Sequence, residues 1–264
     1  MKFQYLILFV LLLASCNNNG QKESQNSTAN EPVNEKKDDI IRKSIPFIGD
    51  FISINNMGTI NIVYTQGPSN IEVEGPKLLV DLVKVTVDSG VLLINMSNER
   101  NVEVQAFQGA RSNITAYVSS PSLNVIAVCS SGNFTTNKIT TDKMHIGSLD
   151  KGSIKIDSLE CDYLKFEVNN IGKSHIGWAK IATDCLLVSS GDGSLDISDI
   201  EVNGTLTLDD ITNSSIVVNG KTANLEINNQ GSGLCEFNGT YKSKSIATGG
   251  KATVVVNGLK ESKN

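Results

Sequence analysis

Apolar residues between Phe134 and Val256 follow one spacing that returns about every twenty positions. The pattern is Φ-x-Φ-x2-Φ-x4-Φ-x-Φ, where Φ is an apolar residue, and one copy runs from Ile154 to Phe166. Two short alternating runs in each period are typical of solenoids, whose repeats bury their apolar faces by stacking on one another. The repeat therefore predicts a chain that is wound into a series of similar coils.

Alignment of the copies assigns an inward face to both strands of each coil, because apolar and polar residues alternate along them. From the first strand, two adjacent columns are expected to face inward: Phe134, Ile154, Ile176, Leu195, Ser214 and Cys235, and beside them Thr136, Ile156, Trp178, Ile197, Ile216 and Phe237. From the second strand, the expected columns are Met144, Leu164, Leu186, Leu206, Leu225 and Ile246, and beside them Ile146, Phe166, Val188, Leu208, Ile227 and Thr248. His145 and His175 fall between these columns and are expected on the surface.

Gly, Asn, Asp and Ser occupy the positions between the strands, where turns are expected. Steps such as Asn219-Gly220 would suit two-residue hairpins, which would make neighbouring strands antiparallel. Like residues nevertheless recur at like positions over about six copies, as they do when each coil stacks in register on the one before. We therefore predict an all-β fold, a parallel β-helix or solenoid, with an antiparallel β-sandwich as the alternative.

The segment 45–118 is also rich in strand-forming residues, but its spacing is less regular. The one short helix or turn expected there runs from Pro76 to Val83. A solenoid needs its first coil covered, because an open apolar end with free strand edges would aggregate. We therefore predict one β-helix domain over residues 45–260, with 45–118 as N-terminal cap and early coils and 119–258 as regular coils.

Residues 1–15 are expected to form a signal peptide that is followed by a lipidated cysteine, Cys16. Lys2 supplies a positive start, and the apolar run from Phe3 to Ala14 is too short to span a bilayer comfortably. The run ends in Leu13-Ala14-Ser15-Cys16, which resembles the bacterial lipobox; an ordinary secretory signal with a chance cysteine is the alternative. The sequence therefore predicts a membrane anchor on the bacterial cell envelope, in the outer membrane or at the cell surface rather than in the inner membrane.

Residues 16–44 are expected to form a flexible polar tether, because Asn, Ser, Gln, Lys and Glu dominate this stretch. Random-coil scaling gives the tether a reach on the order of 30 Å.

The formal net charge of the chain is −5, which argues against nucleic acid as a partner. The four cysteines after Cys16 show no CxxC pair and no metal-ligand spacing, so we expect no metal site and no cofactor.

Several segments resemble the "GIN" domain family, bacterial head domains of autotransporter adhesins. The resemblance covers residues 47–257 and rests on Phe51–Ile54, Gly58–Ile62, Ile71–Gly75, Val91–Ile94 and the Ser-Gly-punctuated repeats from Ser130 onward. It implies an export or lipoprotein signal and a right-handed β-helix related in shape to pectin lyases. It also implies adhesion as the role, and the family has no assigned catalytic residues.

Asp142, Asp162 and Asp184 are the strongest candidates for chemistry, because the alignment places them in one turn column. Carboxylates stacked at about 5 Å could bind a hard cation, or act on a sugar bond; turn residues that bond their own backbone are the alternative. Tyr163 and Tyr241 are expected as exposed aromatic platforms for a sugar.

The sequence therefore favours a non-enzymatic, lipid-anchored envelope protein whose adhesin-like β-helix presents a sheet face to a protein or glycan partner. A carbohydrate-active enzyme, lyase-like or hydrolase-like, on the same scaffold is the first alternative. A purely structural envelope component is the second. The identity of the ligand and the oligomeric state stay open at this point.

Overall fold

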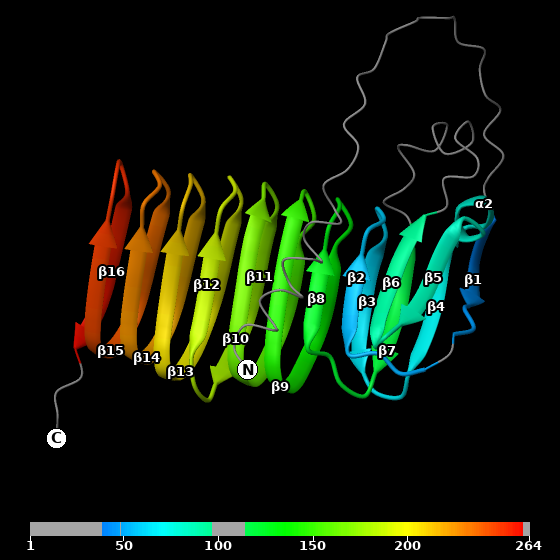
Figure 1. The fold of residues 1–264 in the computed structure, drawn as a ribbon, viewed down its shortest axis with the longest axis horizontal. Helices are drawn as coiled ribbons and strands as arrows, with labels where there is room; N and C mark the ends of the chain where they lie inside the picture. The colour runs from blue at the N-terminus through cyan, green and yellow to red at the C-terminus, as the bar shows by residue number, and fades with distance from the viewer. Residues whose placement is uncertain (1–38, 48, 97–113, 261–264) are drawn as a thin grey trace, which may run out of the picture.

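The computed structural model describes residues 39–47, 49–96 and 114–260, and these form an elongated β-solenoid (Figure 1). Its regular strands are β9 (Phe134–Asp150), β10 (Ile154–Asn170), β11 (Lys173–Ile181), β12 (Cys185–Ser189), β13 (Ser194–Asp210), β14 (Ser215–Asn229), β15 (Leu234–Thr248) and β16 (Thr253–Lys260). Successive coils pair in parallel, and the structure has about seven turns. The predicted all-β solenoid is confirmed.

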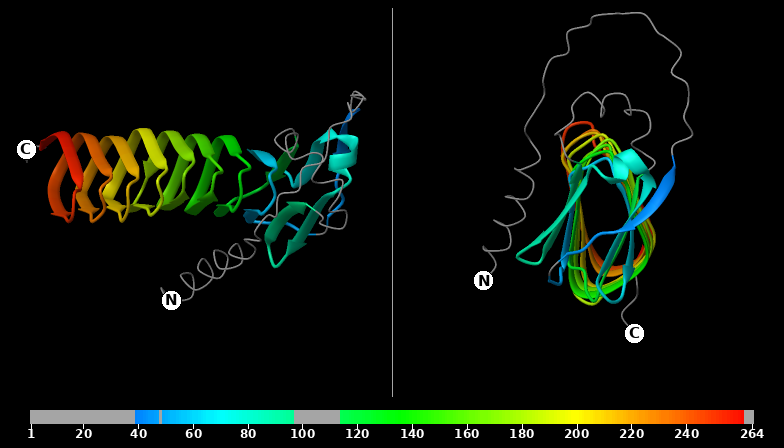
Figure 2. Two further views of the ribbon diagram at one scale, coloured as in Figure 1. Left: turned by 90° about the horizontal axis from the view of Figure 1, so that it is seen from above. Right: turned by 90° about the vertical axis from the view of Figure 1, so that its right-hand side faces the viewer.

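The long strands bend near their middle, so that one strand contributes to two sheets on opposite sides of an oval cross-section (Figure 2). The first half of β9 pairs with β3 (Asn61–Gln66), and its second half pairs with β8 (Val125–Val128). We call the sheet that contains β3, β11 and β16 the first sheet, and the sheet that contains β8 and β12 the second sheet. Inward side chains of both sheets form one continuous apolar core between them.

The early coils do not follow one another in chain order. The first coil, β2 (Ser53–Asn56) with β3, lies between two later ones: β2 pairs with β6 (Val91–Met96) on one side and with β8 on the other. Likewise, β3 pairs with β7 (Thr115–Ser120) on one side and with β9 on the other. The chain therefore forms the β2–β3 coil first, then the strands at the N-terminal end of the solenoid, and then returns to form the regular coils.

Antiparallel elements cover the N-terminal end of the solenoid (Figures 1 and 2). On the first sheet, β1 (Ile40–Ser44) pairs with β4 (Asn70–Pro76), which pairs with β7; on the second sheet, β5 (Val83–Asp88) pairs with β6. The short helix α2 (Lys77–Val80) buries Leu79 and Val80 against the core. The less regular, β-rich cap predicted from the sequence is thus present.

The predicted tether ends earlier than residue 44. Ile40 to Ser44 form β1, whose backbone pairs with β4 over its whole length. Arg42 bonds Glu72 at 2.8 Å, and Lys43 bonds Asp81 at 2.9 Å. Polar composition suggested a flexible segment, but an edge strand can remain polar when its backbone and its charges have partners.

Three coils have a different register from the one predicted. Ile156 pairs with Ile176, so Ser174 takes the inward position beside Ile154, and Trp178 lies half-buried at the bend opposite Ser158. The prediction that Trp178 is in the core was wrong. Hydrophobicity favoured the tryptophan, but the small Ser174 can face inward because its hydroxyl accepts a hydrogen bond from the Ile154 amide.

A second shift lies in β12, where apolar residues occupy consecutive positions, so that alternation does not say which of them face inward. In β12 the buried side chains are Cys185, Leu187 and Ser189, and Leu186 faces outward. In β14 the shift is of two residues: Ile216 pairs with Leu195 and Cys235, whereas the prediction had placed Ser214 in that column, and both Ser214 and Ile216 face inward as predicted. In β15, Ile246 pairs with Ile227 and not with Leu225 as predicted, and its side chain is 42% exposed.

Candidate binding surfaces

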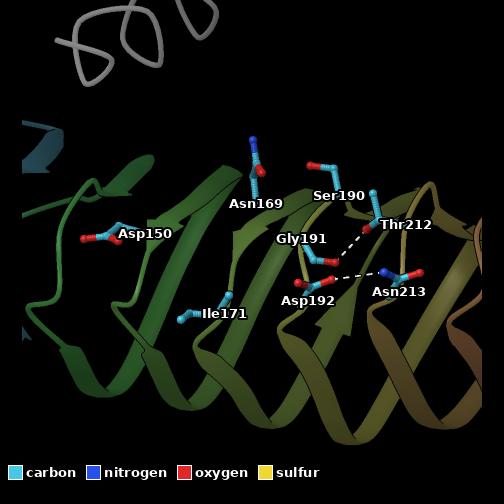
Figure 3. A pocket seen from close by; sticks show the side chains of 8 residues that line it. All are labelled: Asp150, Asn169, Ile171, Ser190, Gly191, Asp192, Thr212 and Asn213. Atoms are coloured by element: carbon cyan, nitrogen blue, oxygen red, sulfur yellow. Dashed lines mark hydrogen bonds between the residues drawn. The ribbon is translucent and has the colours of Figure 1, made fainter. Parts of the chain in front are cut away.

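One hollow lies along the turn edge of the solenoid, where the chain passes from the second sheet back to the first. Its volume is about 410 Å³, and its lining residues come from four successive turns (Figure 3): Asp150, Asn169, Ile171, Ser190, Gly191, Asp192, Thr212 and Asn213. Asp150 ends β9 with a positive φ of 63°, and Ile171 beside it is 59% exposed. The hollow therefore combines carboxylates with one apolar side chain.

Polar groups on the other side of the hollow bond one another across neighbouring coils (Figure 3). The Thr212 hydroxyl donates to the Gly191 carbonyl at 2.6 Å, and the Asn213 amide donates to Asp192 at 3.3 Å. The Ser232 hydroxyl in turn donates to Asn213. Asp192, Asn213 and Ser232 thus form a ladder of side chains. The hydrogen bonds between them stabilise the stacking of neighbouring coils.

A column of buried side chains lies beneath these turns and fixes their shape. Asn229 accepts a hydrogen bond from the N–H two residues on at 3.2 Å, and its amide donates to the carbonyl four residues on at 3.0 Å. Asn56 makes the same two bonds, at 3.2 and 2.6 Å. Asparagine suits this position because its side chain both accepts and donates.

Asp210 occupies the same position one coil before Asn229 and is fully buried. Its Oδ1 accepts from the Thr212 N–H at 3.3 Å and from the Ser214 hydroxyl. Its Oδ2, where asparagine would carry its donor, is buried without a partner in the described part of the chain. Burial raises the pKa of Asp210 above its usual range. The site therefore favours the protonated acid, which alone could donate there.

Outward side chains of the first sheet form a long polar row, which we call the polar face: Thr135, Lys155, His175, Asp196, Val217, Glu236 and Val255. His175 Nδ1 lies 2.8 Å from Asp196 Oδ2, and Lys155 lies 3.2 Å from Asp157. As predicted, His175 is at the surface. Neighbouring coils place these groups about 4.8 Å apart, in a regular array.

An asparagine ladder borders the polar face near its C-terminal end. The Asn238 amide donates to Asn219 at 3.0 Å, and the Asn257 amide donates to Asn238 at 2.8 Å. Each asparagine precedes a glycine, and these glycines also stack, Gly220 on Gly239 and Gly239 on Gly258. The ladder fixes the bend of three coils and keeps amide groups at the edge of the face.

The expected column of three aspartates does not form. Asp142 and Asp162 are exposed at equivalent positions, but the coil of Asp184 has one extra residue, since Cys161 pairs with Ile181 and Leu164 with Cys185. Asp184 instead accepts a hydrogen bond from the Thr205 N–H at 2.8 Å, on the following coil. Among the described residues, no group of three acidic, histidine or cysteine side chains could hold a metal ion.

The two candidate tyrosines have different environments. Tyr163 is half-buried and faces outward beside His145, with ring centroids 5.9 Å apart. Tyr241 is only 6% exposed, so the prediction of an exposed platform was wrong. Its ring lies next to Phe237 with Lys244 over it, 5.4 Å from the centroid. The ring can face inward because it packs against the Phe237 ring, with centroids 6.5 Å apart.

Three cysteines are buried free thiols: Cys161, Cys185 and Cys235. Burial raises the pKa of Cys161 to about 12, and likewise that of Cys235 to about 12. These thiols therefore pack as small apolar residues, as predicted for Cys235. Cys16 lies outside the residues that the structure describes.

Sequence reasoning missed Asp210 and the pair of His175 with Asp196. The spacing of Asp210 and Asn229 by one period was the available signal for Asp210.

An elongated parallel solenoid with one covered end, a regular outward face and shallow turn-edge hollows defines a scaffold for binding. The chain belongs to the family described as "Putative auto-transporter adhesin, head GIN domain", whose model matches residues 50–206. The resemblance predicted from the sequence is confirmed. Within residues 39–47, 49–96 and 114–260, no helix has the length and apolarity needed to cross a membrane.

Solved structures share the fold at low sequence identity. A "putative adhesin" from Bacteroides fragilis is 22% identical with a TM-score of 0.61, over 84% of this chain and 97% of that one. A "putative adhesin" from Parabacteroides distasonis is 17% identical with a TM-score of 0.63, over 84% and 98%. A "Putative lipid binding protein" from the same species is 18% identical with a TM-score of 0.50, over 82% and 96%. No curated protein matches the sequence significantly.

Proposed function

We propose that this protein is a lipid-anchored protein of the bacterial cell envelope that binds a macromolecular partner through the polar face, without turnover. The observation that carries the proposal is the face itself, which continues over successive coils with lysine, histidine and carboxylate groups at fixed spacing. A rigid array of this kind suits an extended partner, because little ordering entropy is lost on the side of the solenoid. Membership of an adhesin family supports the same role.

The lipobox at Leu13–Cys16 supports anchoring, and its test is the substitution Cys16→Ser in the full chain. We expect the variant to lose incorporation of labelled palmitate and to move from the detergent phase to the aqueous phase of Triton X-114, because the anchor is removed. The neighbouring substitution Asn19→Ala should leave both readouts unchanged. Palmitate labelling that persists in Cys16→Ser would contradict the anchor.

Binding through the polar face is tested by photo-cross-linking in intact cells. A photoreactive residue at Val217, on the polar face, should give one discrete adduct, and one at Leu186, outward on the second sheet, should give none. The charge reversal Lys155→Glu should reduce the Val217 adduct about tenfold, whereas Glu226→Lys on the second sheet should leave it unchanged. Equal adducts from both sheets, or shortened products from a glycan incubated with the protein, would overturn the proposal.

A further inference from the structure

At the C-terminal end of the solenoid, no described element lies beyond the edge strand β16, whereas antiparallel strands and α2 lie beyond the regular coils at the N-terminal end (Figures 1 and 2). Among the described residues, β16 has one strand neighbour, β15. The Thr253 N–H donates to the Gly233 carbonyl at 3.1 Å, toward β15. Since alternate residues of a strand point their N–H groups to opposite sides, those of Val254 and Val256 point to the free side. Such groups are a template for another strand.

The apolar side chains at this end are covered less than their counterparts in the coil before. Val254 and Val256 are only partly buried, whereas their partners Cys235 and Phe237 are fully buried. Leu259 is 78% exposed and Ile246 is 42% exposed. One additional strand with apolar residues at alternate positions would cover the two valines, because side chains two residues apart face the same way.

The charge of this end selects among the strands that could add to it. Residues 237–260 contain four lysines, Lys242, Lys244, Lys251 and Lys260, and no acidic residue, in a chain whose net charge is −5. Lys251 precedes β16, Lys260 is its last residue, and both are exposed. A second copy paired through the same edge would bring like charges together, which disfavours self-pairing. An acidic strand is attracted instead.

We propose that β16 accepts an extended, acidic segment of a partner protein as an added parallel strand. Two apolar residues at alternate positions of that segment pack over Val254 and Val256, and its acidic ends meet Lys251 and Lys260. Backbone hydrogen bonds provide affinity, and the apolar and charged positions provide selectivity. The edge of β16 is tested at Lys251, Lys260 and Val256, none of which belongs to the polar face, so failure of one proposal can be distinguished from failure of the other.

The test measures binding of two eight-residue peptides to the full chain. Both have valines at two alternate central positions with threonine between them; one carries glutamates at both ends and the other lysines. We expect the acidic peptide to bind at least tenfold more tightly, with affinity falling as salt rises. In the double variant Lys251→Glu, Lys260→Glu the preference should reverse. The matched control, Lys151→Glu with Lys173→Glu at exposed positions in the middle of the solenoid, should keep the original preference.

A second variant tests the strand edge itself. Val256→Pro removes an N–H that points away from β15, so it should abolish binding of both peptides while circular dichroism keeps the β signal. Binding that survives Val256→Pro, or a preference that does not reverse in the double variant, overturns strand addition. So does sedimentation as a dimer at micromolar concentration, or binding to vesicles that contain phosphatidylglycerol in place of the peptide.

Discussion

The substitution Asp210→Asn is expected to stabilise the protein by about 1–3 kcal/mol at pH 8, the range for satisfying a buried polar group that lacks a partner. Asparagine can keep the bonds that Asp210 accepts from Thr212 and Ser214, and its amide adds a donor at the position of the unpartnered Oδ2. Asn229 and Asn56 already make this arrangement in other coils. Urea unfolding of both proteins measures the difference.

The gain should depend on pH with a defined sign. Burial raises the folded-state pKa of Asp210 above that of the unfolded chain, so the folded state binds the proton more tightly. The contribution of the protonated acid is fully present below the unfolded pKa, which is about 3.9, and is lost as the pH rises through the folded pKa. The advantage of the variant should therefore be small near pH 4 and largest at neutral to alkaline pH.

Asp209→Asn provides the matched control, because Asp209 is the preceding residue and accepts a hydrogen bond from Asn228 at 3.0 Å on the outward side. Asparagine keeps that acceptor, so its free energy of unfolding should change by no more than about 0.5 kcal/mol. If Asp210→Asn destabilised the protein at pH 8, or if its effect did not vary with pH, a protonated Asp210 in the folded state would be ruled out.

The substitution Gly220→Ala is expected to destabilise the protein by about 3 kcal/mol. Gly220 has a φ of +144°, and an added Cβ would lie 2.0 Å from the Ile200 carbonyl oxygen and 2.6 Å from its nitrogen. Both are backbone atoms of the coil before, which cannot move without disturbing the strand pairing on either side. Native-state hydrogen exchange should locate the lost protection in β13, β14 and β15.

Gly67→Ala is the control for this prediction, because an added Cβ at Gly67 would meet no atom within 4 Å. Its free energy of unfolding should change by no more than about 0.5 kcal/mol. Equal effects of the two substitutions would show that the close approach of the coils at Gly220 is relieved by relaxation of the backbone.

The alternation of apolar and polar residues was a reliable guide where each apolar residue had polar neighbours. Phe134, Ile156 and Leu206 are buried as predicted, because in such strands only one parity can enter the core. The guide failed where apolar residues were adjacent, as in Leu186-Leu187, where Leu187 and not Leu186 is buried. There, either set of alternate residues would bury apolar surface, and the pairing with the coils on either side decides which set faces inward.

The candidate site was harder to predict than the fold, because it depends on single-residue register. One extra residue before Cys185 is enough to separate Asp184 from Asp142 and Asp162. The pair of His175 with Asp196 needs two side chains 21 positions apart to meet on adjacent coils, and the misaligned coil hid that contact. The role of these aspartates and of Tyr163 in binding stays a prediction.

The stacked solenoid could be predicted from local pattern, because a period of about twenty residues with two alternating runs buries its apolar faces by stacking. Tertiary structure alone decided the order of the first coils, since β2 and β3 lie between β6, β7 and β8, β9 and no local pattern encodes that insertion. It also decided the inward place of Tyr241 and the unpartnered oxygen of Asp210. Local residues set the period, whereas contacts between coils set the register, and the candidate surfaces depend on register.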